Sequence, residues 1–207
     1  LPDRLFAASR GDASASAASL PRLAASAREA ASCAAVWGGQ TVTLSGAGAS
    51  RQAIRRALSG DPAVAHFATH VLESGGRPRH GLIALSLSPQ GQIEVLTPNE
   101  IGSWNSGPSL VVLSGCASGA GDVLPGAGLM GLTRAWLAVG TRAVAASYWP
   151  TADDTGALFQ SFYRHLKQDP SAGAPGALQQ AQLEMLSASD WRSAPRYWGA
   201  YFVTGSE

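Results

Sequence analysis

Short apolar runs alternate with helical spacings along most of the chain. The runs are rich in valine and alanine, and the segments between them carry apolar residues three or four positions apart. This alternation of strands and helices predicts a parallel sheet with helices packed on both of its faces. Strands are expected at residues 4–9, 41–45, 64–69, 110–115, 142–149 and 201–204.

Capping residues and glycines mark where the helices begin and end. Ser50 can cap a helix, and Thr97 and Glu100 have the spacing of a capping box. Gly38 and Gly140 are placed to end two others. Helices are therefore expected at residues 21–37, 50–58, 97–104, 127–139, 155–166 and 175–187. The first is rich in alanine, and its apolar face is expected to hold Leu23, Ala27, Ala30, Ala34 and Trp37.

The middle of the chain adds a small antiparallel element. Residues 82–87 and 92–96 flank Ser88-Pro89-Gln90-Gly91, which is typical of a hairpin turn, and a polar loop is expected at 73–80. The predicted architecture is an α/β fold of three layers, α/β/α, with a mostly parallel central sheet of about six strands and a small hairpin insertion.

Charge, cysteine content and the length of the apolar segments argue against several classes of function. The 207 residues carry a net charge of +1, with no basic run, so there is no electrostatic case for nucleic acid or an anionic membrane. Two cysteines are too few for a secreted disulfide framework, which favours a reduced, cytoplasmic protein. No apolar segment approaches the length of a membrane span, and the amino terminus lacks the pattern of a signal peptide. Residues 1–19 are interpreted as a strand and loop, and residues 20–207 as the main domain.

Two predicted strands lead into reactive side chains. His70 follows the strand at 64–69, and Cys116 follows the strand at 110–115. If these strands are neighbours in a parallel sheet, the imidazole and the thiol emerge at the same edge, where the imidazole favours the nucleophilic thiolate. The alternative is that Cys116 is a buried core thiol and His70 a loop histidine.

The other candidate groups favour structural roles. His66 is expected to be a satisfied interior histidine and Cys33 a core side chain of the first helix. The histidines and cysteines lack the spacing of a metal site, so no zinc is predicted. Residues 126–131 spell G-x-G-x-x-G, but they do not directly join a strand to a helix, so no dinucleotide cofactor is predicted.

Asp153 and Asp154 follow the strand at 142–149 at the same sheet edge. One interpretation is that they cap the next helix. The other is that one of them lines a pocket beside Cys116 and favours a basic substrate group.

Together these motifs resemble a known family. HFATH at 66–70, LVVLSGCASG at 110–119, and the stretch GAGLMGLTRAWLAVGTRAVAASYW at 126–149 are similar in order and spacing to the CHAT domain. This is a caspase-like domain of the same broad clan of cysteine peptidases as caspases, gingipains and separase. The resemblance extends from about Leu20 to Phe202 and implies a caspase-like fold and a Cys–His dyad.

The resemblance assigns roles to individual residues. Cys116 is implied to be the nucleophile and His70 the imidazole that moves protons during acyl transfer, with the backbone N–H groups of Cys116 and Val71 forming the oxyanion hole. Val71 stands where the family usually has glycine. Ala117-Ser118 replaces the usual acid–threonine pair, and Ala127 replaces an acid.

The resemblance also implies a substrate class and partners. Asp153 matches a position where related enzymes often hold an acid that receives a basic P1 side chain. The expected function is therefore a cysteine endopeptidase that cleaves protein substrates without a cofactor, as the protease module of a larger sensor with an upstream regulatory domain such as helical repeats. Its loop at 119–126 corresponds to one that is cut during maturation in some caspases. The alternative, prompted by Val71, Ala117 and Ala127, is a catalytically silent CHAT interaction module.

Overall fold

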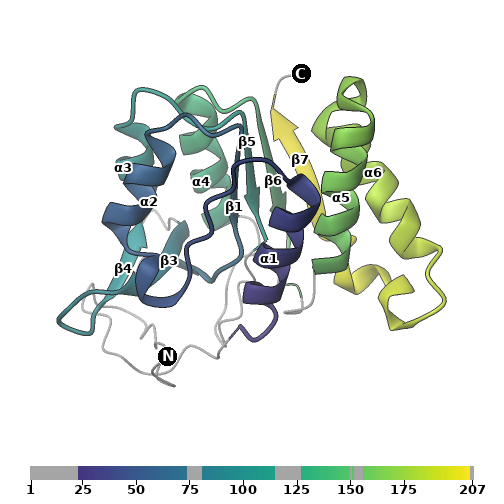
Figure 1. Ribbon diagram of the computed structural model, residues 1–207, viewed down its shortest axis with the longest axis horizontal. Helices are drawn as coiled ribbons and strands as arrows, with labels where there is room; N and C mark the ends of the chain where they lie inside the picture. The colour runs from purple at the N-terminus through teal and green to yellow at the C-terminus, as the bar shows by residue number, and fades with distance from the viewer. Residues whose placement is uncertain (1–22, 74–80, 115–126, 150, 152–155, 206–207) are drawn as a thin grey trace.

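The computed structural model describes residues 23–73, 81–114, 127–149, 151 and 156–205. Within these ranges the chain forms six α-helices and seven strands, together with four short 3-10 turns (Figure 1). The helices are α1 (Ser26–Trp37), α2 (Arg51–Leu58), α3 (Pro98–Gly102), α4 (Ala127–Ala138), α5 (Gly156–Gln168) and α6 (Gly173–Leu186). The strands are β1 (Val64–Phe67), β2 (Val71–Glu73), β3 (Gly81–Leu87), β4 (Ile93–Leu96), β5 (Leu110–Leu113), β6 (Ala143–Ser147) and β7 (Tyr201–Gly205).

The central sheet has the strand order β1-β5-β6-β7. β1, β5 and β6 run parallel to one another, and β7 is antiparallel to β6. Because α4 connects β5 to β6, the two strands can lie side by side and still point in the same direction. The carboxyl ends of the three parallel strands therefore meet at one edge, the lower edge of the sheet in Figure 1.

The two faces of the sheet are buried under different helices, which gives three layers. In β5 every residue is buried: Val111 and Leu113 join one core, while Leu110 and Val112 join the other. The first core includes Trp136 of α4 and Ile101 of α3, and the second is built mainly by α1, α5 and α6. Figure 1 accordingly shows α2, α3 and α4 on one side of the sheet and α1, α5 and α6 on the other. The predicted three-layer α/β/α architecture is confirmed.

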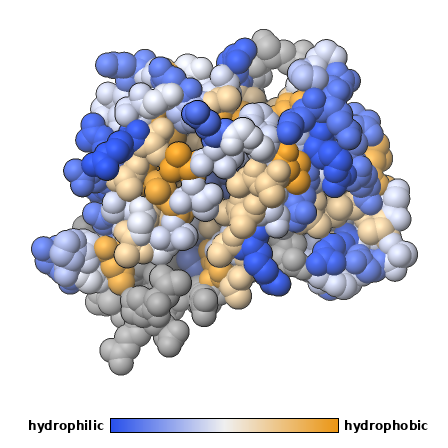
Figure 2. Space-filling view, viewed as in Figure 1, coloured by the Kyte–Doolittle hydropathy of each residue, from blue (hydrophilic) through white to orange (hydrophobic). Residues whose placement is uncertain are grey.

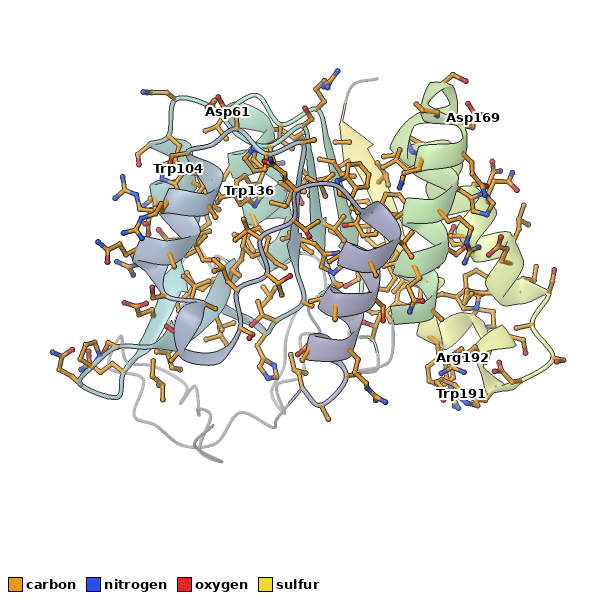
Figure 3. The ribbon with its side chains drawn as sticks, in the orientation of Figure 1. Asp61, Trp104, Trp136, Asp169, Trp191 and Arg192 are labelled. Carbon is orange, nitrogen blue, oxygen red and sulfur yellow. The ribbon has the colours of Figure 1, made fainter. Side chains whose placement is uncertain are left out.

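Aromatic packing fills the first core. The rings of Trp104 and Trp136 meet edge to face with centroids 5.5 Å apart, and Figure 3 labels both on the side of the sheet where α3 and α4 lie. The Trp136 ring also lies 5.8 Å from that of Phe67 on β1. On the outside, hydrophilic side chains cover much of both flanks of the molecule in Figure 2, with apolar side chains more frequent between them.

The small sheet has the order β2-β3-β4 and is antiparallel throughout. β3 and β4 form the predicted hairpin, whose turn includes Gly91 with a φ of 76°. The chain passes from β1 in the central sheet to β2 in the small sheet through residues 68–70. His70 therefore lies where the two sheets join.

Most of the predicted elements are present, and the differences have physical causes. Residues 41–45 were expected to form a strand but pair with no strand in the described part of the chain, and Val42 is 74% exposed. A β-type composition does not make a strand without a ladder partner. The central sheet has four strands in the described residues, fewer than the predicted six or so, and the expected strand at 4–9 lies outside them. β2 falls partly within the predicted polar loop and was not expected as a strand.

The predicted apolar face of α1 is only partly correct. Trp37 packs against the second core as expected, but the residues that α1 and its first flanking turn bury are Ala25, Glu29 and Cys33, whereas Ala27 is exposed. Alanines on every side of this helix give a weak apolar pattern, and the buried stripe includes a carboxylate. Cys33 is a core side chain, as predicted.

Candidate functional site

His70 lies just beyond the carboxyl end of β1, and its side chain is buried. The residue is 7% exposed. Its carbonyl accepts a hydrogen bond of 2.9 Å from the Ala84 N–H of β3, and the neighbouring Thr69 hydroxyl donates to the Ala84 carbonyl, also at 2.9 Å. The hairpin therefore fixes the backbone of the turn that carries the imidazole.

The strand that leads toward Cys116 is the immediate neighbour of β1. β1 and β5 pair in parallel with Phe67 opposite Leu113, and the Ser114 N–H continues the ladder by donating to the Phe67 carbonyl at 3.1 Å. The two strands are therefore neighbours, which is the condition on which the expected meeting of imidazole and thiol depends. His70 and Cys116 each stand three residues beyond the same register pair. Cys116 itself lies outside the described residues.

Val71 begins β2 in an extended conformation that suits its branched side chain. Asp61 is the non-glycine residue with positive φ in the described part, so Val71 has no need of glycine-like backbone freedom. His70 and Ala84 form a hydrogen-bonded pair across the antiparallel ladder, and Val71 and Ile83 are the next pair. Because such pairs alternate, the Val71 N–H points away from β3 and is not used by that ladder.

Asp153 also lies outside the described residues, but the segment just before it is anchored. Thr151 is buried, and its hydroxyl is 2.9 Å from the hydroxyl of Tyr201 on β7. Tyr201 also donates to the carbonyl of Ser114 at 3.3 Å. One tyrosine thus connects the segments that follow β5 and β6.

A buried carboxylate–imidazole pair lies beneath the same sheet edge. Nε2 of His66 is 2.9 Å from Oε1 of Glu29 and 3.1 Å from Oγ of Ser114, while its Nδ1 is 2.8 Å from the Tyr163 hydroxyl. The Glu29 side chain is 4% exposed and that of His66 12%. The prediction that His66 is a satisfied interior histidine is confirmed.

One assignment of protons satisfies this cluster. Burial raises the pKa of Tyr163, and nearby Cys33 and Glu29 raise it further, so its hydroxyl keeps its proton and can donate to Nδ1 of His66. The Nε2–H then faces Glu29 and Ser114, and the Ser114 hydroxyl lies 3.5 Å from the Phe67 carbonyl, to which it can donate.

Exposed aromatic side chains gather at the same end of the sheet. Tyr148 and Trp149, directly after β6, are 52% and 42% exposed, and Tyr148 stacks on Phe202 with centroids 4.0 Å apart. Because β7 is antiparallel to β6, it starts at this edge, and Figure 3 shows Trp191 and Arg192, which precede β7 in the sequence, at the lower end of the molecule. The Arg192 guanidinium lies 4.3 Å from the Trp191 ring.

Several of these residues could not be identified from sequence. Glu29 is a lone acid in an alanine-rich helix, and Tyr163 and Tyr201 are far from His66 and Ser114 along the chain. The one available indication was His66, which lies on a strand otherwise made of small and apolar residues. Its need for polar partners predicts acceptors or donors on the facing helices without identifying them.

The described residues hold no cluster of three or more histidine, cysteine or acidic side chains able to bind a metal ion. Nor do they include a helix long and apolar enough to cross a membrane.

Comparison with known proteins identifies the family to which the chain belongs. No curated protein matches the chain. The family model described as CHAT domain matches residues 2–206, which is nearly the whole sequence. The chain therefore belongs to the CHAT-domain family, which is related to the caspase-like cysteine peptidases.

Proposed function

We propose that this CHAT domain is a cysteine endopeptidase in which Cys116 is the nucleophile and His70 transfers protons. The observation that carries the proposal is the parallel pairing of β1 with β5, which gives both residues the same starting edge and the same three-residue extension beyond it. A thiol and an imidazole on such neighbouring turns are within reach of each other.

The reaction follows from these two groups. The Cys116 thiolate attacks the scissile carbonyl carbon, and the N–H of Val71 and of Cys116 stabilise the oxyanion. The amide C–N bond breaks as the leaving amine takes a proton from His70, which leaves a thioester. Water then attacks the thioester with His70 accepting its proton, and the carboxylic acid product and the thiolate are released. No cofactor is required in these steps.

The substrate is an extended polypeptide. The exposed rings of Tyr148 and Trp149, directly after β6, offer apolar contact area at the edge where Cys116 follows β5. Asp153, two residues after the anchored Thr151, is the proposed acceptor for an arginine or lysine side chain at P1. The natural setting is a larger cytoplasmic sensor whose upstream domain controls the peptidase, since a thiolate nucleophile must stay reduced.

A peptide library tests the dyad directly. Cys116→Ala and His70→Ala should each lower turnover by at least about 10³-fold, because nucleophile and base act as a unit. His165→Ala is the matched control: this histidine pairs with Glu184 on the helices α5 and α6 and should leave turnover unchanged. Failure of the wild-type protein to cleave any peptide, together with alkylation of Cys116 no faster than that of free cysteine, would instead support a silent interaction module.

The P1 preference has a separate test. Asp153→Asn should reduce cleavage after arginine by about 10-fold or more while leaving cleavage after apolar residues, if any, unchanged, because a charge-assisted hydrogen bond is removed. Equal losses for every P1 residue, or no loss, would refute the pocket assignment without affecting the dyad.

A further inference from the structure

We infer that Glu29, His66 and Ser114 are positioning residues that hold the segment carrying Cys116 in its reactive place. The inference rests on the proposed function and extends it to a buried polar network that the dyad itself does not use. The network begins on α1 and β1, passes to the end of β5, and continues through Tyr201 to the segment after β6.

The placement of Ser114 carries the argument. It is the last described residue before Cys116, two positions away, and three of its polar groups are held. Its N–H donates to the Phe67 carbonyl, its hydroxyl faces His66 Nε2 at 3.1 Å, and its carbonyl accepts from the Tyr201 hydroxyl at 3.3 Å. Ser114 is thus held by partners on β1 and on β7, two positions before Cys116 in the sequence.

Glu29 explains why His66 holds its orientation. The imidazole of His66 is fixed at Nε2 by Glu29 and at Nδ1 by Tyr163, and the Phe159 ring packs against it edge to face with centroids 5.3 Å apart. An imidazole held at both nitrogens presents one fixed partner to Ser114. Orienting groups of this kind support a site from a distance of a few bonds without touching the reacting atoms.

Stability alone is a poor explanation for this pair. Burying a carboxylate and an imidazole incurs a desolvation cost, and well-packed apolar side chains of similar volume often serve stability as well or better. The matched exposed pair, His165 and Glu184 at 2.7 Å, shows that the same chemistry occurs in this chain without burial. The buried pair is distinguished by its contact with the end of β5.

The test separates positioning from a purely structural role. Ser114→Ala removes the hydroxyl alone, and the double variant Glu29→Met with His66→Leu replaces the buried pair by apolar side chains that can keep the fold. For folded protein, each should lower kcat by about 10- to 100-fold with KM within about twofold, because the thiol is misplaced while the surface that binds substrate is unchanged. Glu184→Gln, which disrupts the exposed pair, should leave both constants unchanged.

Alkylation of Cys116 by iodoacetamide gives a readout that does not depend on substrate. The same variants should react at least about fivefold more slowly than wild type at pH 7, since a displaced thiol loses the imidazole that favours thiolate. Folded variants with wild-type kcat and wild-type alkylation would overturn the inference. If wild type reacts rapidly and the variants slowly while no peptide is cleaved, the proposed function fails and the positioning role stands.

Discussion

Cys33 is a thiol that the fold keeps unreactive. Burial raises the pKa of Cys33 far above its usual value, and the nearby Glu29 carboxylate raises it further. The same two influences act on the pKa of Tyr163, with Cys33 itself contributing. Both groups therefore stay protonated in the native state across the physiological range, and Cys33 does not compete with Cys116 for thiol reagents.

These shifts predict how stability depends on pH. In the unfolded chain the Cys33 thiol loses its proton above about pH 8.5. Because the native state retains that proton, unfolding releases it at high pH, and the thiol's contribution to stability falls by about 1.4 kcal/mol per pH unit above that point. The free energy of unfolding of Cys33→Ala, measured by urea titration, should therefore fall less steeply between pH 8 and pH 10 than that of wild type. Parallel pH profiles of the two proteins would contradict the prediction.

At the level of elements, α3 is a short helix whose start depends on one side chain. The Thr97 hydroxyl accepts from the Glu100 N–H at 3.1 Å, and Pro98 occupies the first helical turn. The Glu100 carboxylate lies 3.6 Å from Nε of Arg51, so it also links α3 to α2. The helix in turn places Ile101, which is fully buried, against the first core.

Removing this cap should have a measurable cost. Thr97→Ala leaves the Glu100 N–H without its hydroxyl acceptor and should lower the free energy of unfolding by about 1 kcal/mol. Thr97→Ser retains the oxygen and should stay within a few tenths of a kcal/mol of wild type. Chemical denaturation of the three proteins checks the difference, and equal stabilities of the alanine and serine variants would show that the cap contributes nothing.

The sequence pattern correctly predicted the elements that are determined by residues adjacent in the chain. The apolar runs at β1, β5 and β6 and the caps Ser50 and Thr97 are properties of adjacent residues, and the structure has each of them. It failed for β2, since three residues are too few to show an alternation. Alanines lie on every side of α1, so the sequence does not indicate which face is buried. The buried face includes Glu29, whose partner His66 lies 37 positions away in the sequence.

The candidate site, too, could be predicted from the sequence only in part. Strand-end positions indicated that His70 and Cys116 would emerge at one edge if their strands were neighbours, because parallel strands share one edge. The structure shows that β1 and β5 are neighbours. The network through Ser114 and Tyr201 joins residues 87 positions apart, and only tertiary packing brings them together.

At the scale of the whole molecule, the important feature is the connection between the central sheet and the small sheet at residues 68–70. The Thr69 hydroxyl and the His70 carbonyl both bind the backbone of Ala84 on β3. The small sheet is also fixed by burial, since Ile83, Leu85 and Leu96 belong to the first core. Motion of this sheet relative to the central one would displace His70 and leave β5 in place.

Thr69→Val tests how firmly this connection is held. The substitution keeps the branched shape and removes the donor to the Ala84 carbonyl, so we expect a loss of about 1 kcal/mol in stability. Amide hydrogen exchange should accelerate in β2 and at the start of β3 while β5 and β6 remain protected. Thr69→Ser is the control that retains the hydroxyl. Uniform acceleration across both sheets would show that they open as one unit.

The place of Glu29 on α1 has a consequence for dissecting the domain. A fragment beginning after Trp37 would contain every strand in the described structure, together with His70 and Cys116. It would nevertheless lack the carboxylate that faces His66 and the helix that packs on α5. His66 would then lose its carboxylate partner and keep only the Ser114 hydroxyl at Nε2. The shortest autonomous piece of this protein therefore has to include α1, although this helix contains neither His70 nor Cys116 and no strand.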